Sequence, residues 1–182
     1  MDFSWTPHRF SGGALALDVA NSVILRFSPE KSLDRFAVPA QIESFSAAAS
    51  ALSGDQKHGA ALVPTEARNR PILLSLREAT DSYFRMAVSG IDDRLLLARL
   101  LETAAAALRH APHDQSLEAA TARSALQLIA GTERQRIRIC GNCGWLFIDR
   151  SKNRSRVWCD MAVCGNRQKA ARHYHRTKEE TA

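Results

Sequence analysis

The chain has 182 residues, 45% of them hydrophobic, which allows one sizeable core and a small additional module. No apolar run approaches the ~20 residues that cross a bilayer, and the N-terminus lacks the apolar core of a signal peptide, so we expect a cytoplasmic protein that does not enter the membrane. The net charge of +6 is unevenly placed, because residues 132–182 hold 12 Lys and Arg against 5 Asp and Glu, whereas residues 1–131 hold 13 against 14. A nearly neutral body joined to a basic module indicates a polyanionic partner, with nucleic acid as the leading interpretation. A solvated basic surface without a partner is the alternative.

Helical patterns dominate the first part of the chain. The spacing of apolar residues predicts a short amphipathic helix within residues 12–27, after a glycine pair. Two prolines and mixed charges predict a loop over residues 27–41. A helix is predicted next over residues 41–53, and Gly54 would end it.

Three longer helices are predicted in the rest of this region. The first begins near Thr65, is interrupted around Pro71 because a proline in a helix interior costs roughly 3 kcal/mol, and continues to about Val88. The second follows Asp92, an acidic N-cap candidate, and the third runs to Gly131. No strong strand pattern accompanies them, so we expect a compact α-helical domain.

The pattern changes after residue 132. Residues 136–139 alternate with period two, and the WLFID segment at 145–149 is rich in aromatic and β-branched residues, which together predict a short hairpin. From about Cys164 onward, alanines and charges predict a terminal helix. The predicted fold is therefore mainly α, with a helical N-terminal domain over residues 1–131 and a small zinc-binding β-hairpin plus C-terminal helix over residues 132–182.

All four cysteines lie in this C-terminal module. They form a C-x2-C pair, a spacer of fifteen residues and a C-x4-C pair, and two short pairs at this separation can bring four thiolates to one tetrahedral zinc ion. Four thiolates close the coordination sphere, so no position remains for a catalytic water and we expect one structural Zn²⁺. The predicted ligands are Cys140, Cys143, Cys159 and Cys164.

Three other interpretations of the cysteines compete with zinc. A thioredoxin-type redox pair expects a helix that begins at the first pair, whereas strands are predicted to flank it here. An iron–sulfur cluster uses the same ligands and is not excluded by the spacing, although the basic surroundings disfavour it. Structural disulfides would require an oxidising compartment. We therefore favour zinc.

Basic side chains surround the cysteines. The loop between the two pairs is basic, and Lys169, Arg172 and Arg176 follow a three-and-four spacing that places them on one face of the terminal helix. Such a loop and helix can follow a phosphate backbone, while solvated arginines in a loop of local turns are the alternative. The residues predicted to contact nucleic acid are Lys152, Arg154, Arg156, Arg167, Lys169, Arg172 and Arg176.

Two further groups of residues have a functional and a structural interpretation. Trp145, Phe147 and Trp158 would form either an exposed docking patch or the small core that the module needs. Asp18 and Asn21 lie one turn apart on an apolar helix, so they would either project into a ligand pocket or be buried and hydrogen-bonded. The sequence contains no recognisable nucleophile–base pair, phosphate-cradling loop or open metal site, so we expect no enzyme activity.

The C-terminal module resembles the bacterial CGNR zinc finger. The resemblance is carried by C-x2-C, FIDRSKNRSRVWC and a basic, alanine-bearing helix that begins with Cys164, Gly165, Asn166 and Arg167, the four residues that give the finger its name. Upstream, GGALALDVANSV resembles the opening of the ABATE domain that accompanies this finger. A Leu-Asp-Phe-Val-Asn-like string is typical there, and this chain has valine and alanine in place of the bulkier pair.

The resemblance implies a helical N-terminal domain and a C-terminal zinc module that binds DNA, in a family regarded as stress-response transcription regulators. It implies that the four cysteines are zinc ligands and that Arg167 and its basic neighbours contact DNA. We expect DNA as the partner, together with a small-molecule effector and a homodimer of the kind that palindromic sites require. The competing hypotheses are a zinc-scaffolded protein-interaction module and a small-molecule-binding protein without DNA binding.

Overall fold

The computed structural model describes residues 3–56, 59–170 and 174. In the described residues the main helices are α1 (Leu15–Ala20), α2 (Pro39–Leu52), α3 (Arg70–Val88), α4 (Arg94–His110) and α5 (Leu117–Ala130), and the strands are β1 (Val23–Ile24), β2 (Leu33–Asp34), β3 (Ile137–Ile139) and β4 (Leu146–Ile148). Short 3₁₀ turns occupy Pro7–Phe10, Arg35–Ala37, Ala67–Asn69 and Thr132–Arg136, and a π-helical turn, Met161–Gly165, leads into the C-terminal helix. None of these helices is both long and apolar enough to span a bilayer.

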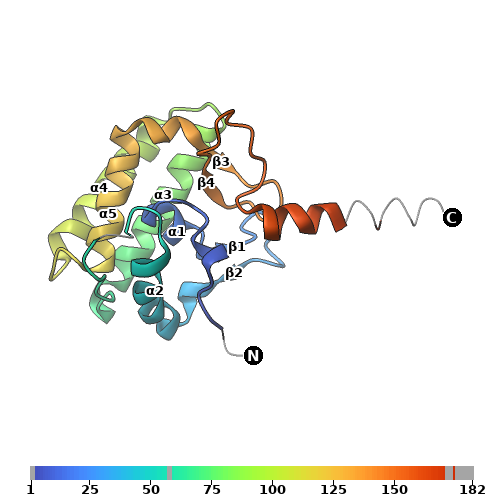
Figure 1. The fold of residues 1–182 in the computed structure, drawn as a ribbon. Coiled ribbons are helices and arrows are strands. Elements are labelled where there is room, and N and C mark those ends of the chain that lie inside the picture. Colours follow the sequence, from blue (N-terminus) through green and yellow to red (C-terminus); the bar gives the residue numbers. More distant parts are fainter. Residues whose placement is uncertain (1–2, 57–58, 171–173, 175–182) are drawn as a thin grey trace.

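The short helix α1 is the centre of the helical body. All six of its residues are buried, and it packs against α3 and α5, while α4 covers the same two helices. Figure 1 shows α3, α4 and α5 grouped on one side, and the C-terminal helix projecting from the other. The main core contains Leu17, Leu76, Phe84, Leu100 and Leu128, one or more from each of these four helices. α1 is therefore enclosed on every side and has no solvent-exposed face.

A second hydrophobic cluster lies beneath α2 and the N-terminal segment. Phe10, Phe36 and Phe45 are buried there, and the partly buried Trp5 packs edge-on against Phe45 with ring centroids 4.9 Å apart. The indole Nε1 of Trp5 donates to the carbonyl of Gln41 at 3.0 Å. This aromatic cluster fixes the chain N-terminal to α1 against the body.

The predicted helix over residues 12–27 is too long. α1 ends at Ala20, and the chain then forms β1, which pairs antiparallel with β2. The amide of Arg35 donates to the Ser22 carbonyl at 3.0 Å, and Leu25 takes a positive φ of 51°, which no helix continues through. The expected loop over residues 27–41 therefore contains β2, a 3₁₀ turn and the start of α2, where Pro39 occupies a first-turn position that needs no amide hydrogen bond.

The other helices follow the sequence pattern closely. Pro71 lies in the first turn of α3 after a 3₁₀ turn, so the predicted interruption is the true beginning of that helix. The N-cap of α4 is Asp93 and not Asp92, since the Asp93 carboxylate accepts from the amides of Leu95 and Leu96. α5 ends at Ala130 with Gly131 as its C-cap, as predicted.

The C-terminal hairpin shares its core with the helical body. β3 and β4 are antiparallel, with Ile137 opposite Ile148 and Ile139 opposite Leu146. Ile137, Leu146 and Ile148 pack into the main core, whereas Phe147, on the opposite face of β4, packs among the cysteines. The mainly α fold with a small hairpin beside the cysteines is therefore confirmed, and the hairpin connects the cysteine cluster to α1 and α3.

Candidate metal centre

The first cysteine pair lies on the tight turn between β3 and β4. Cys140 follows β3 directly, its amide donates to the Trp145 carbonyl at 2.8 Å, and its own carbonyl accepts from the amide of Gly144 at 2.9 Å. Gly144 has a φ of 73°, a left-handed conformation that side chains disfavour. This geometry turns the thiols of Cys140 and Cys143 toward the same point, as in a zinc knuckle.

The second pair is positioned by Asp160. Its carboxylate accepts from the amides of Ala162 and Val163 at 2.8 and 3.3 Å, which starts the π-helical turn immediately after Cys159. The Asp160 carbonyl accepts from the amide of Cys164 at 2.9 Å, and this bond closes the turn around the second thiol. Both cysteines are buried.

The four thiols converge on one point. The Sγ atoms of Cys143 and Cys159 are 3.7 Å apart, as are those of Cys159 and Cys164, and all four sulfur atoms lie within 4.8 Å of one another. A tetrahedral ion with Zn–S bonds of ~2.3 Å requires sulfur–sulfur distances of about 3.8 Å, whereas a disulfide requires ~2.0 Å. The arrangement therefore fits zinc and contains no disulfide.

Without a cation the thiols compete for negative charge. Hydrogen bonds from Cys143 and Cys159 lower the pKa of Cys140, while the shared hydrogen bond with Cys140 raises the pKa of Cys143 and raises that of Cys159 to about 12. A divalent cation offsets this repulsion when four thiolates are held in contact.

Comparison with known families decides the identity of this module. Residues 136–177 match the CGNR zinc finger. The match includes all four cysteines, so the cluster is the zinc site of this finger, and the zinc interpretation displaces the redox and iron–sulfur alternatives. No curated protein matches the chain.

The aromatic residues of the CGNR finger form its small core. Trp145 and Phe147 are 5% and 0% exposed and pack with the four cysteines, which favours the core interpretation over a docking patch for these two residues. Ile24 of β1 also packs on this cluster, and Trp145 Nε1 donates to the Val23 carbonyl at 3.3 Å. The finger is thus completed by residues of the body.

The loop between the cysteine pairs is organised by one buried carboxylate. Asp149 is fully buried, and its side chain accepts from the amides of Ser151 and Arg156 at 2.9 and 2.8 Å. Although burial opposes it, these hydrogen bonds lower the pKa of Asp149. Arg154 has a φ of 48° within this loop. Asp149 therefore fixes a strained, basic loop in one conformation.

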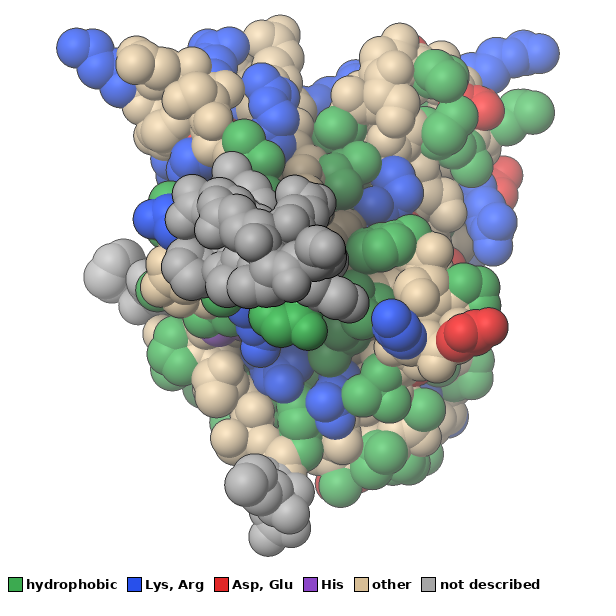
Figure 2. Space-filling model, turned by 90° about the vertical axis from the view of Figure 1, so that its right-hand side faces the viewer, with side chains coloured by type: hydrophobic (Ala, Val, Ile, Leu, Met, Phe, Trp, Pro, Cys, Tyr) green, Lys and Arg blue, Asp and Glu red, His purple; other side chains and the backbone are tan. Residues whose placement is uncertain are grey.

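The predicted nucleic-acid contacts lie at the surface wherever the structure describes them. Lys152, Arg154 and Arg156 are exposed on the loop, and Arg167 and Lys169 are exposed on the C-terminal helix, whereas Arg172 and Arg176 lie outside the described residues. Figure 2 looks onto the face from which that helix projects, and Lys and Arg side chains gather around and below it. Arg156 is partly engaged, because it donates to the Cys159 carbonyl at 2.5 Å and lies over the Phe147 ring.

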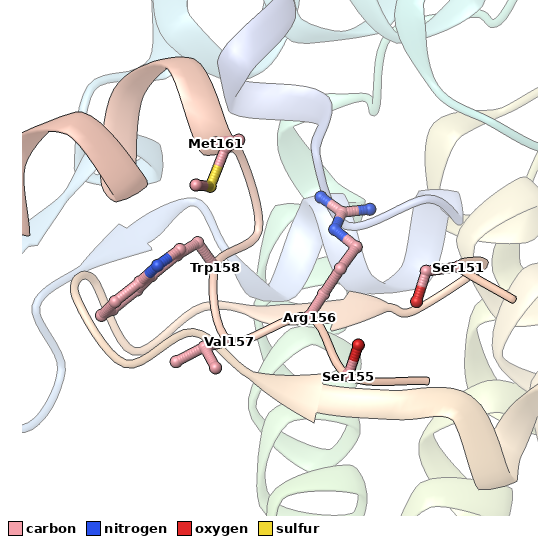
Figure 3. Close-up of a pocket in the computed structure, with 6 residues that line it drawn as sticks. All are labelled: Ser151, Ser155, Arg156, Val157, Trp158 and Met161. Atoms are coloured by element: carbon pink, nitrogen blue, oxygen red, sulfur yellow. The ribbon is translucent and has the colours of Figure 1, made fainter. Parts of the chain in front are cut away.

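Trp158 differs from the other aromatic residues of the finger. It is only partly buried and lines a shallow pocket with the exposed Val157 and Met161 (Figure 3). Ser151, Ser155 and Arg156 complete the lining, and in this view Arg156 points away from Trp158. The pocket is mostly apolar and lies between the loop and the start of the C-terminal helix.

Asp18 and Asn21 connect structural elements and are almost fully buried, at 1% and 3% exposure. Asp18 accepts from the Gly12 amide at 2.9 Å and from the Ser53 hydroxyl at 2.6 Å. Burial raises its pKa to about 8, and the neighbouring Asp55 adds to this effect. Asn21 pairs with the backbone of Leu146 in β4. These contacts correspond to the buried, hydrogen-bonded alternative.

Several residues that support the finger carry no local sequence signal. His8 Nδ1 lies 2.9 Å from Asp160 Oδ2, and its ring lies 5.3 Å from that of Trp145. Arg85 of α3 donates to the Gly144 carbonyl at 3.0 Å. These partners are separated by 59 to 152 residues in the chain, so only the fold reveals them.

Proposed function

We propose that this protein is a cytoplasmic DNA-binding transcription regulator that catalyses no reaction. In this proposal the CGNR finger contacts the phosphate backbone, and the helical body, an ABATE-type domain, senses a small-molecule effector or mediates dimerisation. A stress-responsive role is part of the same proposal, taken from the family resemblance.

The supporting observation is a set of exposed cations beside the zinc site that form no ion pair with the described residues. Among the described exposed cations of the loop and C-terminal helix, Arg150 pairs with Glu133 at 2.8 Å, and the others form no ion pair. Surface cations without acidic partners attract a polyanion, and release of counterions then contributes to the affinity. These residues are Lys152, Arg154, Arg156, Arg167 and Lys169.

Fluorescence anisotropy with labelled duplex DNA at several salt concentrations tests the proposal. Each phosphate contact contributes ~0.9 to the slope of log affinity against log salt, so four to six contacts predict a slope of about −4 to −5. Replacing Lys152 and Lys169 by Gln should reduce the slope by about 2. Arg99→Gln with Arg109→Gln is the matched control, since both residues are exposed on α4. Absence of binding at low salt would refute the proposal.

A zinc-scaffolded docking surface is the second candidate function. It is supported by Trp158 and by Val157 and Met161, which are 56% and 55% exposed around one apolar pocket. Under this alternative the wild-type protein binds no DNA. Replacing Val157 and Met161 by Ser weakens its self-association in sedimentation experiments. If DNA binding is present and unaffected by these two substitutions, the docking alternative is not supported.

A further inference from the structure

Two arginines of the body share one aromatic platform at the N-terminal end of the described chain. The guanidinium carbon of Arg9 lies 4.7 Å from the centre of the Phe3 ring, and that of Arg35 lies 4.1 Å from the same point. Because both distances end at the centre of one ring, the two guanidinium carbons are at most 8.8 Å apart, although they come from separate 3₁₀ segments. Stacking on an aromatic face holds both in place.

The platform itself is fixed to the body. Phe3 packs edge-on against Trp5 with ring centroids 4.9 Å apart, and Trp5 packs in the same manner on the buried Phe45. The arginines are therefore held on a rigid base, and little side-chain freedom remains to be lost when a ligand binds.

Neither guanidinium has a partner for its charge among the described residues. Within those ranges, Arg9 and Arg35 form no ion pair and donate no side-chain hydrogen bond, and the Nε atom of each is buried without an acceptor. Burial lowers the pKa of Arg9, and the positive charges of Arg35 and Arg167 lower it further. Buried donors and neighbouring like charges are unfavourable unless an anion compensates them.

This pair of arginines lies beside the zinc finger. Arg9 belongs to the 3₁₀ turn Pro7–Phe10, and its neighbour His8 contacts Asp160, the residue that starts the turn between Cys159 and Cys164. Arg167 lies on the C-terminal helix that follows this turn. It is exposed and forms no ion pair with the described carboxylates. Arg9 thus lies one residue from a direct contact with the turn that leads into the C-terminal helix.

We propose that Arg9 and Arg35 together bind one phosphate group, which belongs to the DNA backbone when DNA occupies the finger. The planar guanidinium donates two parallel hydrogen bonds to an oxyanion, so Arg9 and Arg35 can supply up to four donors to the two non-bridging oxygens of a backbone phosphate. The inference rests on the proposed function and extends it, because it adds the helical body to the DNA-binding surface.

The test compares three double variants by DNA anisotropy across salt concentrations. Arg9→Gln with Arg35→Gln should reduce the salt slope by ~1, the contribution of one phosphate, and should weaken binding at least tenfold at moderate salt. Arg9→Lys with Arg35→Lys keeps the charge and loses the planar fork, so it should retain the slope while losing part of the affinity. Arg99→Gln with Arg109→Gln removes the same charge from α4 and should behave as wild type.

Circular dichroism and zinc content establish that each variant is folded. If the wild-type protein binds DNA and the Arg9→Gln, Arg35→Gln variant binds with the same affinity and slope, the inference is wrong and the proposed function stands. If the wild type binds no DNA, the proposed function fails, and the site is then probed with inorganic phosphate and pyrophosphate by thermal shift. If phosphate or pyrophosphate raises the melting temperature of the wild type but not that of the Arg9→Gln, Arg35→Gln variant, the phosphate site is supported. Equal responses would overturn it.

Discussion

The side-chain amide of Asn21 forms a two-way hydrogen-bonded pair with the backbone of Leu146. Its Nδ2 donates to the Leu146 carbonyl at 2.8 Å, and its Oδ1 accepts from the Leu146 amide at 2.9 Å. The amide thereby takes the place of a neighbouring strand at the edge of β4. This single residue at the end of α1 joins the helical body to the hairpin that bears the first two zinc ligands.

Replacing Asn21 by Ala should therefore destabilise both parts of the protein. The change removes two buried hydrogen bonds and leaves the Leu146 amide and carbonyl without partners, which costs about 2–4 kcal/mol. Urea unfolding of the zinc-loaded protein measures this loss. As a control, Ser44→Ala at an exposed position of α2 should change the free energy of unfolding by less than about 0.5 kcal/mol. If Asn21→Ala is as stable as the wild type, the pairing with Leu146 is contradicted.

Zinc removal should unfold more than the finger. Ile137, Leu146 and Ile148 of the hairpin belong to the main core, so loss of the metal that closes the turn between β3 and β4 exposes part of that core. We expect Cys159→Ser, or a strong chelator, to lower the melting temperature of the helical signal in circular dichroism as well. An unchanged helical transition after zinc loss would show that the body folds independently.

The buried carboxyl of Asp18 should make folding stability depend on pH. Its folded pKa of about 8 exceeds the unfolded value, so the folded chain holds a proton that the unfolded chain releases. Stability should accordingly fall as the pH rises from about 5 toward 8, by at most about 1.4 kcal/mol per pH unit.

The substitution Asp18→Asn removes this titration and should flatten the pH dependence, since the other titrating groups are common to both proteins. Urea denaturation of both zinc-loaded proteins at about pH 5.5 and about pH 7.5 measures the difference. Parallel pH profiles would show that Asp18 is ionised in the folded state.

Gly144 should tolerate no side chain. Alanine there must adopt a φ of 73°, and its Cβ would lie 2.5 Å from the Phe27 ring. Gly90 has a φ of 81° and no atom within 4 Å of the place that a Cβ would occupy, so Gly90→Ala isolates the backbone cost, which is about 1 kcal/mol. We expect Gly144→Ala to exceed that cost and to weaken zinc binding in competition with a chromogenic chelator. Equal effects of the two substitutions would contradict this role.

The sequence predicts the zinc site better than it predicts the body around it. Cysteine spacing is a local pattern with a demanding geometric outcome, so Cys140, Cys143, Cys159 and Cys164 could be identified as ligands of one metal without a fold. The long helices could also be placed, because capping residues and Pro71 mark their ends.

The parts that could not be predicted depend on contacts between distant segments. α1 ends early because Asn21 turns to meet Leu146, 125 residues away, and no local pattern encodes that contact. His8 and Asp160 are 152 residues apart. The spacing of Asp18 and Asn21 predicts that they share one helix, yet what each side chain contacts is set by neighbouring elements.

The most direct test of the central claim, that a zinc-dependent finger binds DNA, is sequencing of genomic fragments captured by the intact protein and by its Cys159→Ser variant. The variant loses one of four ligands and with it the folded finger. We predict that the intact protein enriches a defined set of fragments and that the variant enriches none. Equal enrichment by both proteins, or no enrichment by either, would contradict the account.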